Sequence, residues 1–220
     1  NLGSITRHEP PSVILGTGGW LLGGIKFDAA NTRIQYSNTA FANIRPVTFV
    51  AGIRPLGVGE NNAGNIVSKD DATTGCWRFG LTNTATLQFI KYQTTSLVVT
   101  AADNTLIYNQ KCDVALTWDG SITAANAKIY KNGREVSYLT QTDADSISND
   151  PARAFMIGNN TGPSRTFNGY IYYLYMFSRA LSPSEIQQLY QEPYCFIEYK
   201  PWTMWGAVTA AGGQAVQYIQ

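Results

Sequence analysis

The sequence predicts an all-β protein, an antiparallel β-sandwich of the jelly-roll type with one short helix close to its C-terminal end. About a dozen short segments rich in β-branched and aromatic residues recur along the 220 residues, with polar or glycine-containing turns between them. One segment, residues 182–192, carries the start and stop signals of a helix. A chain of this length is also long enough for one all-β domain with a substantial core.

The expected strands follow one another closely along the chain. Residues 25–27 and 33–36 alternate in polarity around a turn, which predicts a first hairpin. Residues 47–54 form a strongly β run between two prolines. Asn132-Gly133 predicts a tight hairpin, because both residues tolerate positive φ, and residues 140–152 read as a polar, acidic loop. Further strands are expected at 65–69, 77–81, 86–92, 97–100, 114–118, 127–130, 134–139 and 155–158.

The strand expected at residues 169–177 is apolar on both faces, so both faces should be covered. Because side chains alternate along a strand, one face is expected to carry Ile171, Tyr173, Tyr175 and Phe177, and the other Tyr170, Tyr172, Leu174 and Met176.

A short helix should follow this strand and cover one of its faces. Ser182 suits the N-cap, Pro183 suits the first helical position, and Glu185 completes a capping box. Ile186 and Leu189 then begin an apolar stripe on one side of the helix.

The ends of the chain differ in composition from the middle. Residues 1–19 are expected to form an N-terminal arm without regular structure, since they contain Pro10-Pro11 and several glycines. Residues 20–192 should form the jelly-roll domain, and residues 193–220 an aromatic and then Ala/Gly/Gln-rich tail. Exposed tryptophan favours burial against a partner, so the candidate docking residues are Trp202, Met204 and Trp205.

Charge and hydropathy exclude several classes of function. The net charge is +1 without a basic run, so no nucleic-acid partner is expected. No apolar stretch is long enough to predict a membrane span. Charged residues make up only 14% of the chain, which fits either an extracellular β protein or a surface partly buried in an assembly. Cys76, Cys112 and Cys195 allow at most one internal disulfide and are expected to be small buried residues.

Catalytic patterns are weak, and we do not expect an enzyme. A glycosidase needs two carboxylates flanking the scissile bond, which on one strand means an acid-x-acid pattern, and no expected strand has one. The only histidine, His8, lies in the arm, so neither a Ser-His-Asp arrangement nor a transition-metal site is expected. Glycoside hydrolysis remains a remote alternative.

Two kinds of binding site remain open. Sugar rings stack on aromatic faces while amides hold their hydroxyls, which makes the glycan-binding candidates Trp77, Tyr92, Tyr170, Tyr172, Asn159 and Asn160. No cofactor is certain, but calcium takes oxygen ligands from loops, and the carboxylates that could supply them are Asp70, Asp71, Asp143, Asp145 and Asp150.

Seven stretches in order, over roughly residues 20–191, resemble the laminin-G-like, concanavalin-A-like jelly-roll domains. They are GGIKFDAANTRIQY, RPVTFVAGIRP, NIVSKDD, DVALTWDGS, AKIYKNGREV, FMIGNN and FNGYIYYLYMFSRALSPSEIQQLY. The resemblance implies a jelly roll, often with a calcium ion at its rim. Two departures stand out: Tyr172-Tyr173 replaces the family's Asp-Glu pair, and Cys112-Asp113 replaces its His pair.

A second, shorter resemblance concerns the start of the tail. LYQEPYCFIEYKPW is similar to the segment that follows such domains in many bacteriophage and prophage proteins. It implies a virion or other extracellular, surface-borne location, with other protein subunits as partners.

Two functions are therefore expected. The first is a non-enzymatic structural protein of a virion or cell surface, of the coat, decoration or fibre type, that docks on neighbouring subunits through its arm and tail. The second is an adhesion module that binds cell-surface or matrix glycans through rim loops. The ends of the chain favour the first.

Overall fold

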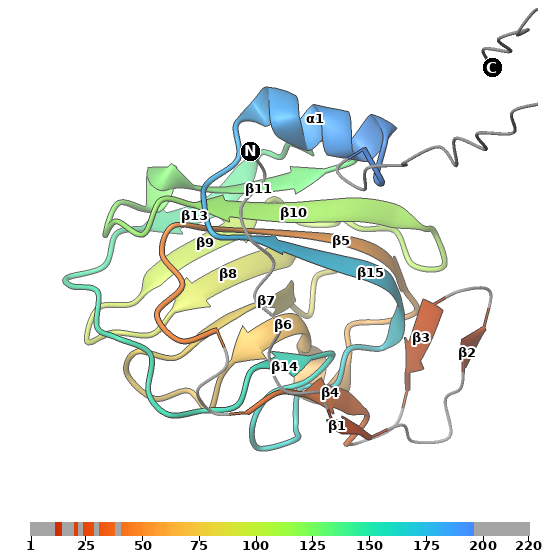
Figure 1. Cartoon of the computed structure of the whole chain (residues 1–220), viewed down its shortest axis with the longest axis horizontal. Helices are drawn as coiled ribbons and strands as arrows, with labels where there is room; N and C mark the ends of the chain where they lie inside the picture. The colour runs from red at the N-terminus through yellow and green to blue at the C-terminus, as the bar shows by residue number, and fades with distance from the viewer. Residues whose placement is uncertain (1–11, 15–19, 22–23, 29–30, 38–40, 196–220) are drawn as a thin grey trace, which may run out of the picture.

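Two antiparallel sheets pack face to face as a sandwich in the computed structural model, which describes residues 12–14, 20–21, 24–28, 31–37 and 41–195. This is the predicted fold class (Figure 1). The eight-stranded sheet runs in the order β1 (Ser12–Ile14), β4 (Arg33–Gln35), β14 (Met156–Ile157), β6 (Gly64–Lys69), β7 (Trp77–Leu81), β8 (Leu87–Lys91), β9 (Leu97–Ala101) and β13 (Tyr138–Thr142). The seven-stranded sheet runs in the order β12 (Arg134–Glu135), β11 (Ala127–Lys131), β10 (Cys112–Trp118), β5 (Val47–Pro55), β15 (Gly169–Phe177), β3 (Gly24–Phe27) and β2 (Trp20–Leu21).

The core lies between the two sheets and is rich in aromatic residues. Phe49 of β5 stacks on Trp77 of β7 with ring centroids 5.2 Å apart, and Phe89 of β8 meets Trp118 of β10 at 5.5 Å. All four rings are buried. Burial of large apolar side chains contributes roughly 1.5–3 kcal/mol each, so these four rings contribute substantially to the stability of the sandwich.

The first predicted hairpin is wrong in its pairing, although both of its strands exist. β3 pairs with β2 and β15 in one sheet, whereas β4 pairs with β1 and β14 in the other. β3 and β4 therefore belong to different sheets. The sequence did not reveal this, because a polar turn signal looks the same in a hairpin and in a connection between sheets. β1 itself corrects a second expectation, since Ser12–Ile14 belongs to the segment predicted as an arm without regular structure.

The Asn132-Gly133 hairpin is confirmed. β11 and β12 pair around it, and both turn residues have the positive φ that the turn requires, 48° for Asn132 and 76° for Gly133. The strand expected to continue to Leu139 instead breaks after Glu135, and the chain crosses to the other sheet as β13. Residues 138–142, which were expected to end that strand and begin the polar loop, thus form an edge strand.

β15 has the predicted bounds but not the predicted faces. Its pairing with β5 shifts register between Ile171 and Tyr173, so Tyr172 is the extra residue of a β-bulge. Beyond the bulge the alternation is inverted: Leu174 and Met176 join Ile171 against the main core. The other face carries the remaining aromatic residues, of which Tyr173, Tyr175 and Phe177 pack in a second cluster under the helix.

Helix α1 (Pro183–Gln191) covers part of this outer face, as predicted (Figure 1). Ser182 and Glu185 form the expected capping box, and Arg179 holds the Glu185 carboxylate at 2.6 Å. Ile186 and Leu189 pack against Val50, Ala115 and Tyr130 of the seven-stranded sheet. The other helical turns among the described residues are the 3-10 segments Glu60–Asn62 and Ala124–Asn126, and in this part of the chain no helix is long and apolar enough to cross a membrane.

Candidate functional site

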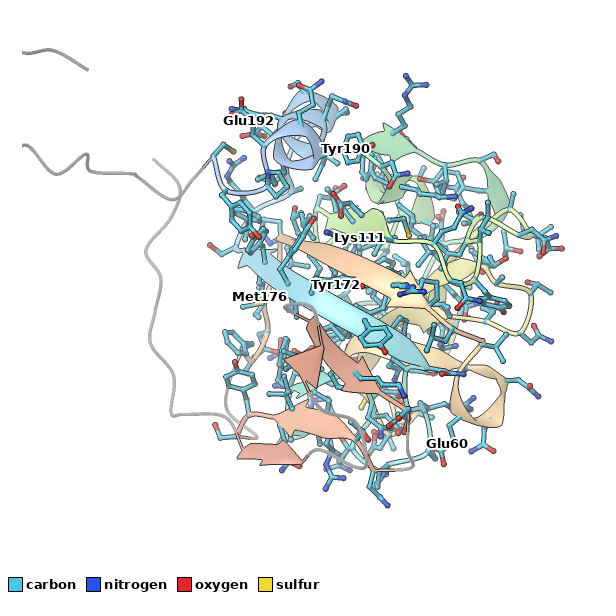
Figure 2. All side chains as sticks on the ribbon, turned by 90° about the vertical axis from the view of Figure 1, so that its right-hand side faces the viewer. Glu60, Lys111, Tyr172, Met176, Tyr190 and Glu192 are labelled. Atoms are coloured by element: carbon cyan, nitrogen blue, oxygen red, sulfur yellow. The ribbon has the colours of Figure 1, made fainter. Side chains whose placement is uncertain are left out.

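A pair of tyrosines on the outer face of the seven-stranded sheet forms the candidate site. Tyr170 and Tyr172 are half-buried and stack with ring centroids 6.3 Å apart and planes 21° apart. The guanidinium of Arg54 lies 5.9 Å from the Tyr170 centroid, and the ammonium of Lys111 lies 4.8 Å from that of Tyr172. We refer to Tyr170, Tyr172, Arg54 and Lys111 as the tyrosine platform; Figure 2 views it with Tyr172 and Lys111 labelled.

Glycines on the neighbouring strands make room for the rings of β15. A Cβ atom added at Gly24 of β3 would lie 2.7 Å from the Tyr172 ring, so this ring rests directly on the backbone of β3. The Tyr173 ring lies over Gly52 of β5 in the same way. The bulge and the two glycines therefore hold consecutive tyrosine rings against the outer face of the sheet. With Gly24 beneath it, the Tyr172 ring is capped by the ammonium of the exposed Lys111.

Arg54 is the better fixed of the two cations. It pairs across the sheet with Tyr170, and its Nε donates to the backbone oxygen of Asn109 at 3.0 Å. Lys26 pairs with Tyr170 from the other side and forms an ion pair with Asp28 at 2.8 Å. Cations over tyrosine rings gain roughly 0.5–1 kcal/mol at exposed sites. Because this gain is small, the Lys111 side chain can leave the ring at little cost.

Tyr173 and Tyr175, which pack under the helix, differ in chemistry from the tyrosine platform. Tyr173 and Tyr175 stack with centroids 4.8 Å apart. Burial, together with the facing carboxylate of Asp113, raises the pKa of Tyr173. Burial raises the pKa of Tyr175 to about 12, with Tyr194 as a further cause. These two phenols stay neutral at physiological pH and serve mainly as packing surface.

Trp77 is not available as a sugar-binding residue, which corrects the prediction. It points to the inner face of β7, is only 6% exposed and stacks on Phe49. Its Nε1 donates to Asp150 Oδ2 at 3.2 Å, so its polar atom is also occupied. Strand alternation places it beside Phe79 and Leu81 in the core.

Tyr92, Asn159 and Asn160 also serve structural roles. The Tyr92 hydroxyl accepts a hydrogen bond from Arg78 Nε at 3.1 Å on the outer face of the eight-stranded sheet. Asn159 is fully buried; its Oδ1 accepts from two backbone N–H groups, while its Nδ2 donates to Thr32 and Thr166. Asn160, 7% exposed, closes the same loop through Ser164. These three candidates lie away from the tyrosine platform.

The five carboxylates considered for calcium are dispersed. Within the described part of the chain, no group of three or more acidic, histidine or cysteine residues has the arrangement of a metal site. Asp71 accepts from Thr73 and Cys76 and pairs with Arg153, Asp143 accepts from the backbone of Ala124, and Asp145 is exposed. Asp70 is buried, which raises the pKa of its carboxyl.

Asp150 belongs instead to a buried ion pair that the sequence analysis missed. Its Oδ1 lies 2.7 Å from Lys91 Nζ, and the two side chains are 4% and 1% exposed. Lys91 also donates to the backbone oxygen of Gly75 at 2.6 Å. Burial lowers the pKa of Lys91 despite the opposing effect of Asp150. The pair fixes the loop before β14 onto the end of β8.

Other expected features lie partly outside the described residues. The docking candidates Trp202, Met204 and Trp205 and most of the predicted arm fall there. Of the cysteines, Cys76 and Cys112 are buried as expected, Cys195 is exposed, and all three are free thiols. Arg54 and Lys111 were not anticipated, since neither lies near Tyr170 or Tyr172 in sequence. The closest signals were Gly24 and Gly52, which interrupt otherwise β-rich segments.

Comparisons with known proteins agree with the fold. The family model Laminin_G_3, the concanavalin A-like lectin/glucanases superfamily, matches residues 28–187. In a search of curated protein sequences, none matches this chain.

Similar solved structures share the fold at low sequence identity. Trypanosoma rangeli sialidase in complex with the inhibitor DANA is 13% identical with a TM-score of 0.57, covering 82% of this chain and 29% of its own. The HCR/D W1238A mutant is 15% identical with a TM-score of 0.59, covering 84% and 47%. The binding domain of Paraclostridial Mosquitocidal Protein 1 is 15% identical with a TM-score of 0.58, covering 84% and 48%.

This chain therefore spans less than half of each of these proteins. Identities this low support the shared fold alone. Because the family model covers most of the described sandwich, the chain belongs to the concanavalin A-like lectin/glucanases superfamily.

Proposed function

We propose that this domain is a non-enzymatic recognition module that holds a saccharide against the tyrosine platform. The observation that carries the proposal is the Tyr172 ring, which rests on Gly24 and is capped by the movable Lys111. Displacement of the lysine side chain would present an aromatic face to a sugar ring. A fixed aromatic face of this kind suits the C–H surface of a sugar.

The surroundings of the ring supply the polar contacts that a saccharide needs. The guanidinium of Arg54 over Tyr170 offers hydrogen-bond donors, and the tyrosine hydroxyls can both donate and accept. Saccharide sites combine apolar faces with a few such placed polar groups. The family supports the proposal in a general way, since the matching family model describes concanavalin A-like lectins and glucanases.

Replacing Tyr172 by alanine is expected to weaken saccharide binding about tenfold. Loss of one aromatic stacking partner accounts for about 1–1.5 kcal/mol, which corresponds to that factor in Kd. A glycan array would identify the ligand, and isothermal titration calorimetry would compare the variants. Tyr190→Ala is the matched control, because Tyr190 is 40% exposed on α1, away from the platform (Figure 2). A blank array, or equal affinities for the two variants, would count against the proposal.

Docking to other protein subunits is the second candidate function. Its support is the exposure of Tyr190 and Tyr194, 40% and 63%, at the end of α1 where residues 193–220 follow. Deletion of residues 193–220 should leave a folded domain that has lost its assembly partners, as judged by size-exclusion chromatography and electron microscopy. Deletion of 206–220 alone, which keeps both tail tryptophans, is the control. Unchanged assembly after the longer deletion would contradict this role.

A further inference from the structure

We propose that the saccharide bound at the tyrosine platform is an acidic one, with its carboxylate or sulfate group held by Arg54 and Lys111. This inference rests on the proposed saccharide-binding function and specifies the class of ligand. The charges around the two rings, the fixed orientation of Arg54 and the position of the cations relative to the aromatic faces all favour an anionic ligand.

The tyrosine platform carries a net positive charge. Among the residues that the structure describes, neither Arg54 nor Lys111 forms an ion pair, whereas Lys26 beside them is neutralised by Asp28. Asp113 is the acid that acts electrostatically on Lys111, but it is half-buried and faces Tyr173 under the helix. A neutral ligand would desolvate two cations without compensation, whereas an anionic group would pair with them.

Arg54 is oriented to accept such a group. Its Nε is fixed on the Asn109 carbonyl, and its two terminal nitrogens make no hydrogen bond within the described residues. A guanidinium held in this way offers a planar fork that matches a carboxylate or sulfate. Because less side-chain freedom is lost when the ligand binds, this contact should supply a large part of the affinity.

The geometry combines the anion contact with stacking. The Tyr170 and Tyr172 rings lie 6.3 Å apart, with Arg54 over the first and Lys111 over the second. A sugar ring that replaces Lys111 on Tyr172 therefore lies beside the guanidinium over Tyr170. Arg54 lies in β5 and Lys111 directly before β10, so both cations approach β15 from the same side, and the displaced ammonium can still reach the anionic group of the same or the next sugar. One acidic saccharide thus engages all four platform residues.

Calorimetric titration of the full chain with three hexasaccharides tests this inference. One is built of galacturonic acid, one of neutral galactose and one of sulfated galactose. At low salt the acidic probes are expected to bind at least tenfold more tightly than the neutral one, as for a charge-assisted contact. Comparison of the carboxylated and the sulfated hexasaccharide shows which anionic group is preferred. Arg54→Gln and Lys111→Met should each remove most of this preference, measured within each variant as the ratio of the neutral to the acidic Kd. Arg134→Gln, at the exposed edge strand β12, is the control for loss of one positive charge.

The outcomes separate the two proposals. If no saccharide binds, the proposed function fails and the inference falls with it. If neutral and acidic hexasaccharides bind equally, or if Arg54→Gln keeps the preference, the inference alone is overturned. Hexaglutamate tests for charge attraction without a sugar: binding as tight as that of hexagalacturonate would also overturn it.

Discussion

Replacing Lys91 by methionine is expected to lower the free energy of unfolding by about 3–5 kcal/mol, a large part of the stability of a typical domain. Lys91 Nζ lies 2.7 Å from Asp150 Oδ1, and both side chains are almost fully buried. Methionine leaves the Asp150 carboxylate inside the protein with hydrogen bonds from the N–H groups of Trp77 and Asn43 and with the attraction of the buried Lys69, but without its direct ion pair. Denaturant unfolding followed by tryptophan fluorescence or circular dichroism measures the loss.

A double replacement tests whether the loss comes from the pair or from the orphaned charge. Burial lowers the pKa of Lys91 even with Asp150 beside it, so the surroundings oppose the positive charge. Lys91→Met combined with Asp150→Leu should therefore be clearly less destabilised than the sum of the two single variants. Strictly additive losses would contradict this account of the pair.

A surface ion pair provides the matched control. Lys128 and Glu135 are 3.0 Å apart, but their side chains are 41% and 34% exposed. Solvent screens such pairs, so Lys128→Met should change the unfolding free energy by at most about 1 kcal/mol. A loss as large as that of Lys91→Met would show that burial is not the cause.

The sequence predicted most strands and the helix because their signals are local. Alternation and turn residues located β5, β7 to β11 and β15, and the capping box located the start of α1. Lys91 could also have been assigned inward, since it shares strand parity with the buried Leu87 and Phe89. The bulge at Tyr172 left no signal, because aromatic residues stand on both sides of it and suit either face.

The candidate site was only half predictable for a related reason. Tyr170 and Tyr172 were recognised from their residue type, but Arg54 and Lys111 reach them only through the strand order β10-β5-β15-β3. Strand order depends on contacts between distant segments, which one sequence does not reveal. The same limitation produced the incorrect hairpin between β3 and β4. The prediction of Trp77 as a sugar-binding residue failed for a local reason, since strand alternation groups Trp77 with the buried Phe79 and Leu81.

Gly158→Ala is the second substitution for which we expect a large loss, about 3 kcal/mol or more. Gly158 has φ of 79°, in the left-handed region where an L residue costs roughly 1–2 kcal/mol. An alanine Cβ would also overlap the ring of Phe27, which is fully buried and cannot move outward. Overpacking of this kind adds about 1–3 kcal/mol.

The backbone around Gly158 cannot relax to relieve the overlap. Its N–H donates to the Ile66 oxygen at 3.0 Å, and its carbonyl accepts from the Phe167 N–H at 2.8 Å, so a shift would break contacts with β6 and with the segment leading into β15. Gly162→Ala in the same loop is the control, because a Cβ there meets nothing within 4 Å. Thermal or denaturant unfolding should leave the control within about 0.5 kcal/mol of the native chain. If the unfolding free energy of Gly158→Ala is equally close to that of the native chain, Phe27 and β3 can shift to accommodate the added Cβ, and this account is wrong.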